Sequence, residues 1–386
     1  MIPRTAAPLI HTLLKGFPVA TVTGPRQSGK TTLARAIMAG KPYRSLEDPD
    51  QRAFALDDPR GFLAQLPDGG VLDEIQRAPE LLSYLQTQVD ADGRMGRFLL
   101  TGSQQLGLLS SVTQSLAGRS GMVELLPLTY AELSEASMAP TDLDTAMFKG
   151  GYPALYDRQL QPQHWFSAYV SAYVERDVRQ LLNVKDLSAF QRFVRLCAGR
   201  SGQIVNLSTL AADCGINHNT AKAWISVLEA SYVVYLLQPH HANFNKRLVK
   251  SPKLYFYDTG LLCWLLGIQA AQQLATHPLR GAIFETWVIS ELRKTWMHRG
   301  NPPAFYFWRD SNGLEVDLII DQAGALTPVE IKSGMTINRD YFTSLQRWKA
   351  LAGSQAAEAI LIYGGTEGQK RTDVRVLGWQ QVKELA

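Results

Sequence analysis

The first residues that could do chemistry lie in a glycine-rich stretch, GPRQSGKT, from Gly24 to Thr31. A short β-branched run (19–23) precedes it and a helix-forming run (31–38) follows it. In this P-loop pattern, successive backbone N–H groups converge on phosphate oxygens, and the helix N-terminus adds positive charge. We therefore expect a site for ATP, with Lys30 at the β- and γ-phosphates and the Thr31 hydroxyl on Mg²⁺. The residues expected to line it are Gly24, Pro25, Arg26, Gln27, Ser28, Gly29, Lys30, Thr31 and Thr32.

Two carboxylates follow a second apolar run, in GGVLDEIQ. Asp73 and Glu74 would stand at the carboxyl edge of a buried strand, which is where α/β sheets hold their ligands. We expect Asp73 to hold Mg²⁺ with its water shell and Glu74 to polarise the attacking water. The alternative is that Asp73 only caps the next helix. Beside a P-loop, the pair favours hydrolysis over transfer of phosphate to an acceptor.

Two more polar residues flank later apolar runs. Ser103 ends the run RFLLTGS and would sense the γ-phosphate or position the water; equally, it would cap the helix that follows. Arg119 stands just before another apolar run. It would meet a γ-phosphate as an arginine finger, in cis or across a subunit interface, or it is simply a surface arginine.

A second group of charges lies in GLEVDLIIDQAGALTPVEIKSG (313–334), which reads as two strands joined by a short turn. Residues two apart in a strand share a face, so Glu315 and Asp317 point the same way, as do Glu330 and Lys332. If the turn places Asp317 opposite Glu330, or two residues away, all four charges lie on one side. A slip of one residue would separate the two pairs.

An acidic residue also interrupts the apolar stripe of an upstream helix, GAIFETWVISELRK (281–294). A carboxylate at such a position is costly unless it meets a cation. Glu285, Asp317 and Glu330 are therefore predicted to hold a divalent metal, with Lys332 beside a scissile phosphate. The plainer alternative is that the hairpin charges form a solvated outer face.

The segment GQIVNLSTLAADCGINHNTAKAWISVLEASYVVYLLQP (202–239) reads as a helix, a three-residue turn with glycine, a second helix and a strand. This order predicts a winged helix-turn-helix, and exposed polar and basic residues would contact DNA. Winged helices also bind proteins, and a basic stretch is often only a solvated face. The candidate DNA contacts are His218, Asn219, Lys222, Lys246, Arg247, Lys250 and Lys253.

The composition is that of a globular chain with room for two or three domains. Its 386 residues are 46% hydrophobic and 19% charged, with a formal net charge of +4, too small to argue for an anionic partner by itself. The cysteines Cys197, Cys214 and Cys263 have neither disulfide-framework nor zinc-ligand spacing. We found no signal peptide or bilayer-length apolar run, so we expect a cytoplasmic protein without a membrane partner.

The stretches GPRQSGKTTL, VLDEIQRAPEL, LLTGSQQL and LAGR, in this order, resemble AAA-type (AAA+) P-loop ATPases of bacteria and archaea that carry a C-terminal domain of unknown function. That resemblance implies a homo-oligomer assembled around the nucleotide, either a ring, for example of six subunits, or a smaller assembly, with ATP hydrolysis driven by Glu74. The order Glu285, Asp317, Glu330 and Lys332 resembles the PD-(D/E)XK nuclease fold. It implies Mg²⁺-dependent phosphodiester cleavage, or DNA binding without cutting.

The expected fold class is α/β with a P-loop parallel sheet. We expect an ATPase core (1–130), a helical lid or linker (131–183), a winged helix-turn-helix (184–257) and a nuclease-like α/β domain (258–386). The leading hypothesis is an Mg²⁺-dependent ATPase that acts on DNA, including branched DNA. Two alternatives remain: a DNA nuclease gated by ATP, and a nucleotide-dependent switch that recruits a protein and cuts nothing.

Overall fold

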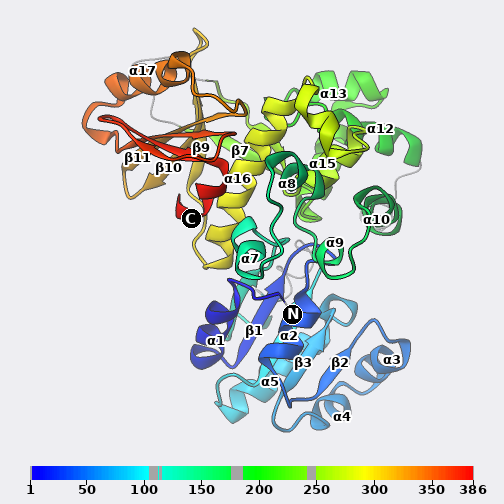
Figure 1. The fold of residues 1–386 in the computed structure, drawn as a ribbon. Coiled ribbons are helices and arrows are strands. Elements are labelled where there is room, and N and C mark those ends of the chain that lie inside the picture. Colours follow the sequence, from blue (N-terminus) through cyan, green and yellow to red (C-terminus); the bar gives the residue numbers. More distant parts are fainter. Residues whose placement is uncertain (1, 104–111, 113–114, 175–185, 241–248, 386) are drawn as a thin grey trace. The chain divides into compact units, whose positions relative to one another are not determined.

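The computed structural model describes residues 2–103, 112, 115–174, 186–240 and 249–385. The chain forms two compact units (Figure 1). The first contains 1–128 together with two short later pieces, 230–232 and 297–301; the second contains the remainder. Each unit is built on a β-sheet of its own. Within the described residues, no helix combines the length and the apolar character needed to cross a membrane.

The first unit has a five-stranded sheet in the order β2-β3-β4-β1-β5, and every neighbouring pair is parallel. The carboxyl ends of the strands therefore meet at one edge, as predicted for a P-loop fold. The strands are β1 (Val19–Thr23), β2 (Tyr43–Ser45), β3 (Gly70–Asp73), β4 (Phe98–Gly102) and β5 (Ser120–Glu124). The helices are α1 (Ala7–Gly16), α2 (Lys30–Ile37), α3 (Pro49–Asp57), α4 (Pro59–Ala64) and α5 (Leu81–Asp92), with a 3₁₀ turn at Ile75–Arg77.

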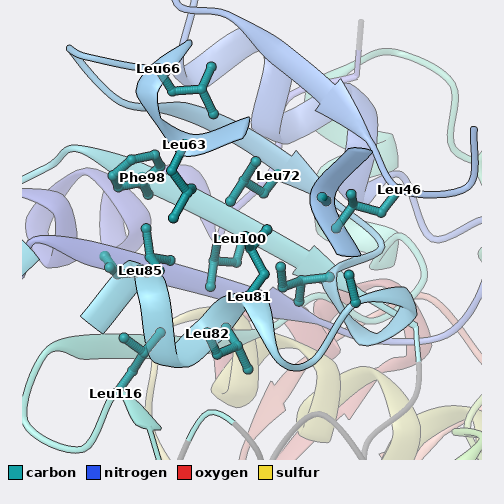
Figure 2. Close-up of a cluster of buried hydrophobic side chains, with 14 of the residues drawn as sticks. Leu46, Leu63, Leu66, Leu72, Leu81, Leu82, Leu85, Phe98, Leu100 and Leu116 are labelled. Atoms are coloured by element: carbon teal, nitrogen blue, oxygen red, sulfur yellow. The ribbon is translucent and has the colours of Figure 1, made fainter. Parts of the chain in front are cut away.

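Both faces of this sheet are covered, since its three central strands, β3, β4 and β1, are buried along their whole length. Leu72, Phe98 and Leu100 pack on one face in a cluster that includes leucines from α4 and α5 (Figure 2). Val71 and Leu99 point to the other face and join the buried residues of α1 and α2. Burial of each such side chain contributes about 1.5–3 kcal/mol to the free energy of unfolding. The two-sided core holds the strand ends rigidly in place.

A short piece of the distant chain completes the first unit. His298 is fully buried, and its Nε2 accepts a hydrogen bond from the backbone N–H of Leu126 at 3.0 Å. Both residues belong to the first unit, although 172 positions separate them.

The second unit has a nine-stranded mixed sheet in the order β13-β14-β12-β11-β10-β9-β7-β8-β6. Strands β9, β10 and β11 form an antiparallel meander, and β12 and β14 add to β11 in parallel. The strands are β6 (Gln203–Ile204), β7 (Val234–Pro239), β8 (Lys253–Phe256), β9 (Phe305–Arg309), β10 (Glu315–Gln322), β11 (Ala325–Lys332), β12 (Ala359–Tyr363), β13 (Gln369–Lys370) and β14 (Val374–Gly378).

The helices of the second unit lie before β6 or between later strands of its sheet. They are α7 (Tyr130–Glu135), α8 (Leu143–Lys149), α9 (Ala154–Asp157), α10 (Pro162–Tyr169), α12 (Leu187–Ala198), α13 (Leu207–Cys214), α14 (His218–Ala230), α15 (Thr259–Leu265), α16 (Arg280–His298) and α17 (Thr343–Ala352). A π-helical turn covers Val170–Val174, and 3₁₀ turns cover Ala271–Thr276, Arg339–Phe342, Gly353–Gln355 and Trp379–Leu385.

The expected order of helix, turn, helix and strand is present over α13, α14 and β7. Gly215 ends α13 in the left-handed conformation at φ 70°, which an L side chain adopts poorly. The Asn217 side chain then accepts a hydrogen bond from the backbone N–H of Thr220 at 2.8 Å and starts α14. Glycine and asparagine thus set the tight turn between the two helices.

The β-hairpin predicted from the C-terminal charges is also present. Strands β10 and β11 are joined by two residues, Ala323 and Gly324, with φ values of 55° and 90°. Two left-handed residues in succession are the signature of a type I′ hairpin turn. The Asp321 carboxylate fixes the turn by accepting the Gly324 N–H at 2.9 Å.

Candidate functional site

The P-loop of the first unit lies between β1 and α2, at the carboxyl edge of the sheet. Gly24, Gln27 and Gly29 all have positive φ, at 143°, 60° and 97°. A Cβ atom on Gly24 would lie 2.2 Å from the backbone oxygen of Leu125, so no other residue fits there. The glycines of the motif therefore serve the backbone curl that a phosphate cradle requires.

The amine of Lys30 lies within the loop itself. Its Nζ donates to the carbonyl oxygens of Gly24 at 3.0 Å and Pro25 at 2.7 Å. Burial lowers the pKa of Lys30 to about 8, against the opposing effect of Glu74 and Asp73. Burial disfavours the charged form of Lys30 in this pocket, so a phosphate group bound beside the amine would stabilise that charged form strongly.

An arginine far from the motif also organises the loop. Arg4 donates to the carbonyl oxygens of Ser28 and Leu126, each at 2.7 Å, and is itself buried. The sequence offered no signal for this role, since Arg4 stands alone 24 residues before the loop residue it contacts.

The carboxylate of Asp73 ends β3 beside the P-loop, as predicted. Thr31 donates its hydroxyl to both carboxylate oxygens at 3.0 Å, Tyr43 donates at 2.7 Å, and Thr101 donates as well. Among the described residues, Asp73 caps no helix. One carboxylate next to a loop threonine fits Mg²⁺, which takes one or two protein oxygens and completes its shell with phosphates and water.

Glu74 follows Asp73 in a strained, left-handed conformation at φ 56°. Its carboxylate accepts hydrogen bonds from the Ser103 hydroxyl at 2.7 Å and from the Gln76 amide. Ser103 therefore lies beside the expected general base. The alternative, that Ser103 caps a following helix, concerns residues 104–111, which lie outside the described residues. Neither Gln76 nor Tyr43 was anticipated, because nothing in their local sequence marks them.

The remaining P-loop positions differ in their surroundings. Arg26 is buried and its guanidinium lies 3.9 Å from the carboxylate of Glu47. Ser28 is also buried, whereas the side chain of Gln27 is exposed. Thr32 lies in the first turn of α2.

The prediction that Arg119 reaches the γ-phosphate in cis is wrong. Strand β5 is parallel to β1, with Ser120 opposite Val19, so Arg119 precedes the amino end of the sheet. The P-loop follows the carboxyl end, roughly 15 Å away along a five-residue strand. Arg119 instead pairs with Asp90, its Nη2 2.8 Å from Oδ2. A surface ion pair or a role in trans remains compatible with that position.

The second unit gathers the predicted hairpin charges on one side of the sheet. Leu318 pairs with Val329, and this register places Asp317 opposite Glu330. The Lys332 amine lies 2.5 Å from Glu330 Oε1 and 3.4 Å from Asp317 Oδ2. The alignment that the sequence left open is therefore the one that brings the charges together.

Glu285 of α16 joins this carboxylate cluster, which comprises Glu285, Glu315, Asp317 and Glu330. Burial and the neighbouring charge of Asp317 raise the pKa of Glu285 to about 7 and that of Glu330 to about 8. The Oε2 atom of Glu330 is buried and finds no hydrogen-bond partner among the residues that the structure describes. Three cationic side chains of the described residues pair with these four carboxylates: Lys253, Lys332 and Arg309. The raised pKa values favour the protonated forms of Glu285 and Glu330 near neutral pH.

The prediction that Lys253 contacts DNA is wrong. Its side chain is only 3% exposed, and its Nζ lies 3.1 Å from Glu285 Oε1 and 2.5 Å from Glu315 Oε1. Burial disfavours the ammonium, but the adjacent carboxylates raise the pKa of Lys253 above its usual value. Lys253 is a buried counter-ion, inaccessible to a phosphate backbone.

The predicted three-carboxylate metal site needs correction as well. Over the part of the chain that the structure describes, no three His, Cys, Asp or Glu side chains are grouped so that they could hold a metal ion. The physical reason is the pair of lysines: Lys253 is bound to Glu285, while Lys332 is bound to Asp317 and Glu330. Glu285 does meet a cation, as its position in the apolar stripe predicts, but that cation is the Lys253 ammonium and not a metal ion.

The other DNA-contact candidates lie where solvent reaches them. His218, Asn219 and Lys222 are exposed along one face of α14, and Lys250 is exposed before β8. Lys246 and Arg247 lie outside the described residues.

Comparison with known families accounts for most of the chain. Residues 16–134 match a family described as an AAA domain, residues 140–272 a domain of unknown function (DUF8612), and residues 280–382 another (DUF4143). The uncharacterized protein Rv2008c of Mycobacterium tuberculosis is 32% identical over 366 residues, which are 94% of this chain and 80% of that protein. The uncharacterized protein Mb2031c of Mycobacterium bovis matches equally well. The chain belongs to the same family as these two proteins.

The family match and the site together define the first unit. It is an AAA-type P-loop domain that binds ATP, and the protein is an ATPase. Among solved structures, the Walker-type ATPase Paby2304 of Pyrococcus abyssi is 14% identical, with a TM-score of 0.45 over 69% of this chain and 96% of that one. AMPPCP-bound DnaA from Aquifex aeolicus is 15% identical, with a TM-score of 0.28 over 58% of this chain and 85% of that one.

Proposed function

We propose that this ATPase uses Mg²⁺-dependent hydrolysis to act on DNA, through a winged helix-turn-helix and a nuclease-like domain in its second unit. The observation that carries the hydrolytic part is the meeting of Lys30, Thr31, Asp73 and Glu74 at one sheet edge. Mg²⁺ at Thr31 and Asp73 would neutralise charge on the β- and γ-phosphates.

Two side chains must change partners when ATP binds. Lys30 would leave the carbonyls of Gly24 and Pro25, because phosphate oxygens are stronger acceptors for an ammonium. Glu74 would release the hydroxyl of Ser103 and accept a proton from the attacking water. Ser103 is then placed beside that water or the γ-phosphate, the role first considered for it.

ATP turnover by purified variants tests this assignment. Lys30→Ala should weaken nucleotide binding, and Glu74→Gln should bind ATP but turn it over roughly 10²–10⁴-fold more slowly, the usual range for a lost general base. Lys15→Ala is the matched control for Lys30, since Lys15 is exposed on α1. Turnover by both site variants at the parental rate would show that the site lies elsewhere.

The DNA part of the proposal rests on α14. Its exposed face carries His218, Asn219 and Lys222, while Trp224, Leu228 and other apolar residues of the helix are buried. A helix that follows a tight turn and presents polar groups on its first turns can enter the major groove. Two arginines of α12, Arg192 and Arg195, are also exposed and would add phosphate contacts.

A nuclease-like role is the second candidate, and the unpartnered Glu330 oxygen favours it. The order α16, β9-β10-β11 meander, α17 and parallel β12 supports a PD-(D/E)XK-like topology. Asp317 and Glu330 would be the ligands of a divalent cation, and Lys332 would stabilise charge on a phosphate. The bound ion would polarise a phosphate oxygen and lower the pKa of a water molecule.

Incubating the protein with branched or supercoiled DNA, Mg²⁺ and ATP distinguishes the candidate functions. Cleavage that Asp317→Asn abolishes supports the nuclease; salt-sensitive binding of intact DNA supports a DNA-acting ATPase that does not cut. An ATPase that neither binds nor cuts DNA would favour the protein-recruiting switch.

A further inference from the structure

We infer that Lys253 acts as a resident cation that competes with a divalent metal ion for the Glu285 side of the carboxylate cluster. The inference rests on the proposed capacity of this cluster to bind a divalent cation. The new element is that a side chain of the protein, Lys253, restricts the binding of a divalent cation by the cluster. It also explains why the helix carboxylate is absent from any three-ligand group in the described chain.

The placement of Lys253 is the first observation. Its ammonium lies between Glu285 Oε1, at 3.1 Å, and Glu315 Oε1, at 2.5 Å, and the side chain is 3% exposed. Glu285 also accepts a hydrogen bond from the Tyr255 hydroxyl at 2.5 Å. Lys253 and Tyr255 are two apart in β8 and point to the same face, so one strand supplies both donors to Glu285.

The other side of the cluster is less completely satisfied. Lys332 is bound to Glu330 Oε1 and Asp317 Oδ2, but it is 34% exposed and sits at the end of its strand. Glu330 is only 4% exposed, and no described residue forms a hydrogen bond with its Oε2. Burial and the nearby charge of Asp317 raise the pKa of Glu330, so a cation bound at this oxygen would replace a proton and favour the ionised carboxylate.

The two lysines therefore differ in how readily a metal ion could displace them from the carboxylates. Lys332 can turn toward solvent and leave Asp317 and Glu330 free to bind an ion. Lys253 has no such exit, because it is enclosed and held by two carboxylates. A divalent ion that approaches Glu285 meets an ammonium already in place, and the two cations repel each other.

Binding of Mn²⁺ in the absence of nucleotide tests the inference directly. Titrations followed by electron paramagnetic resonance would use the full chain with Asp73→Asn, which removes the acid of the nucleotide site. Replacing Lys253 by Met should tighten Mn²⁺ binding at least tenfold. Adding Glu285→Gln to Lys253→Met should abolish that gain, while Asp317→Asn should abolish binding altogether.

Lys250→Met is the matched control, since Lys250 is an exposed lysine only three positions away. It should leave Mn²⁺ affinity unchanged. An affinity that Lys253→Met leaves equal or makes weaker would overturn the inference. A gain that survives the loss of Glu285 would overturn it as well, because the freed carboxylate would not be the ligand.

The Lys253→Met chain could fold poorly, because Glu285 would lose its ammonium partner and Glu315 would keep only Arg309 as a counter-ion among the described residues. The double variant Lys253→Met/Glu315→Gln removes the excess charge and keeps Glu285 available. Its melting temperature should rise on addition of Mn²⁺ by more than that of the parent, and an equal rise would count against competition. If these variants gain Mn²⁺ but no form of the protein cuts DNA, the competition stands and the proposed nuclease activity fails.

Discussion

At the scale of single residues, Asp73 shows how the site is held ready without a ligand. Its carboxylate accepts hydroxyl hydrogen bonds from Thr31, Tyr43 and Thr101, which come from three different elements. Thr101 also accepts the backbone N–H of Glu74 at 3.2 Å. The two acids are thus tied to each other through one threonine. Orientation is built in before ATP arrives, which reduces the cost of reaching the reactive geometry.

Tyr43→Phe isolates one of these orienting contacts. Hydrogen bonds to charged groups contribute about 1.5–3 kcal/mol, so we expect the Mg²⁺ concentration for half-maximal ATP turnover to rise by roughly 10-fold or more. The rise should exceed any change in maximal rate, since Tyr43 contacts the ligand of the ion and not the water. Tyr84→Phe is the control, because Tyr84 is 38% exposed on α5. Equal Mg²⁺ dependence in both variants would contradict the assignment.

The lowered pKa of Lys30 predicts proton uptake on nucleotide binding. With a pKa of about 8, Lys30 is half protonated at pH 8 in the free protein. Phosphate favours the charged form and raises that pKa, so the complex should take up about half a proton at pH 8 and almost none at pH 6. Calorimetry in buffers of different ionisation enthalpy measures this uptake. Lys30→Arg, which is always charged, should remove it.

At the scale of secondary-structure elements, some features follow from a local sequence pattern, whereas others depend on packing between segments that are distant in sequence. The strand, loop and helix around Lys30 are contiguous in sequence, so the motif alone predicted them correctly. Lys253 was assigned to a basic surface stretch, yet it lies on a fully buried strand, β8. That burial arises from its neighbours in the sheet, which are distant in sequence. Arg4 and Tyr43 likewise make their contacts with residues distant in sequence, Ser28 and Asp73.

The hairpin of β10 and β11 illustrates an intermediate case. Its two strands and turn were evident from alternating apolar residues, but two registers were compatible with the sequence. The pairing of Leu318 with Val329 decides between them, and it follows from the two-residue turn at 323–324. The charged face could therefore be predicted only as one of two outcomes.

Helix α14 makes a prediction of its own. If its exposed face lies against DNA, Lys222→Ala should weaken binding at every salt concentration. It should also lower the slope of log affinity against log salt by about 0.9, the value for one lost phosphate contact. Ser226→Ala is the comparison within the same exposed face, as it removes no charge. Fluorescence anisotropy between low and physiological salt distinguishes the two slopes, and identical slopes would remove Lys222 from the interface.

At the scale of the whole molecule, assembly is the property that would give Arg119 a partner. Its position at the amino end of the sheet excludes its own nucleotide, and only a neighbouring subunit could bring a γ-phosphate within reach. Homo-oligomers with a shared nucleotide site use arginines in this manner.

ATP-dependent assembly is therefore expected, and Glu74→Gln should make it visible by retaining the nucleotide. Light scattering coupled to size exclusion should show a larger mass for this variant with ATP and Mg²⁺ than without them. Lys30→Ala should remain at the smaller mass under both conditions. A single mass for both variants in every condition would refute nucleotide-driven assembly and leave Arg119 as a surface ion pair.

The chain returns to its ATPase unit twice after leaving it at residue 128, at 230–232 and at 297–301. Ending the chain after the family match at residue 134 would therefore discard two pieces that pack within the ATPase unit. Such a fragment would lose His298, leaving the amide of Leu126 to find another acceptor beside the loop that Arg4 steadies. Recombination of this ATPase domain with different C-terminal regions is consequently restricted, because the new C-terminal region must supply segments equivalent to 230–232 and 297–301.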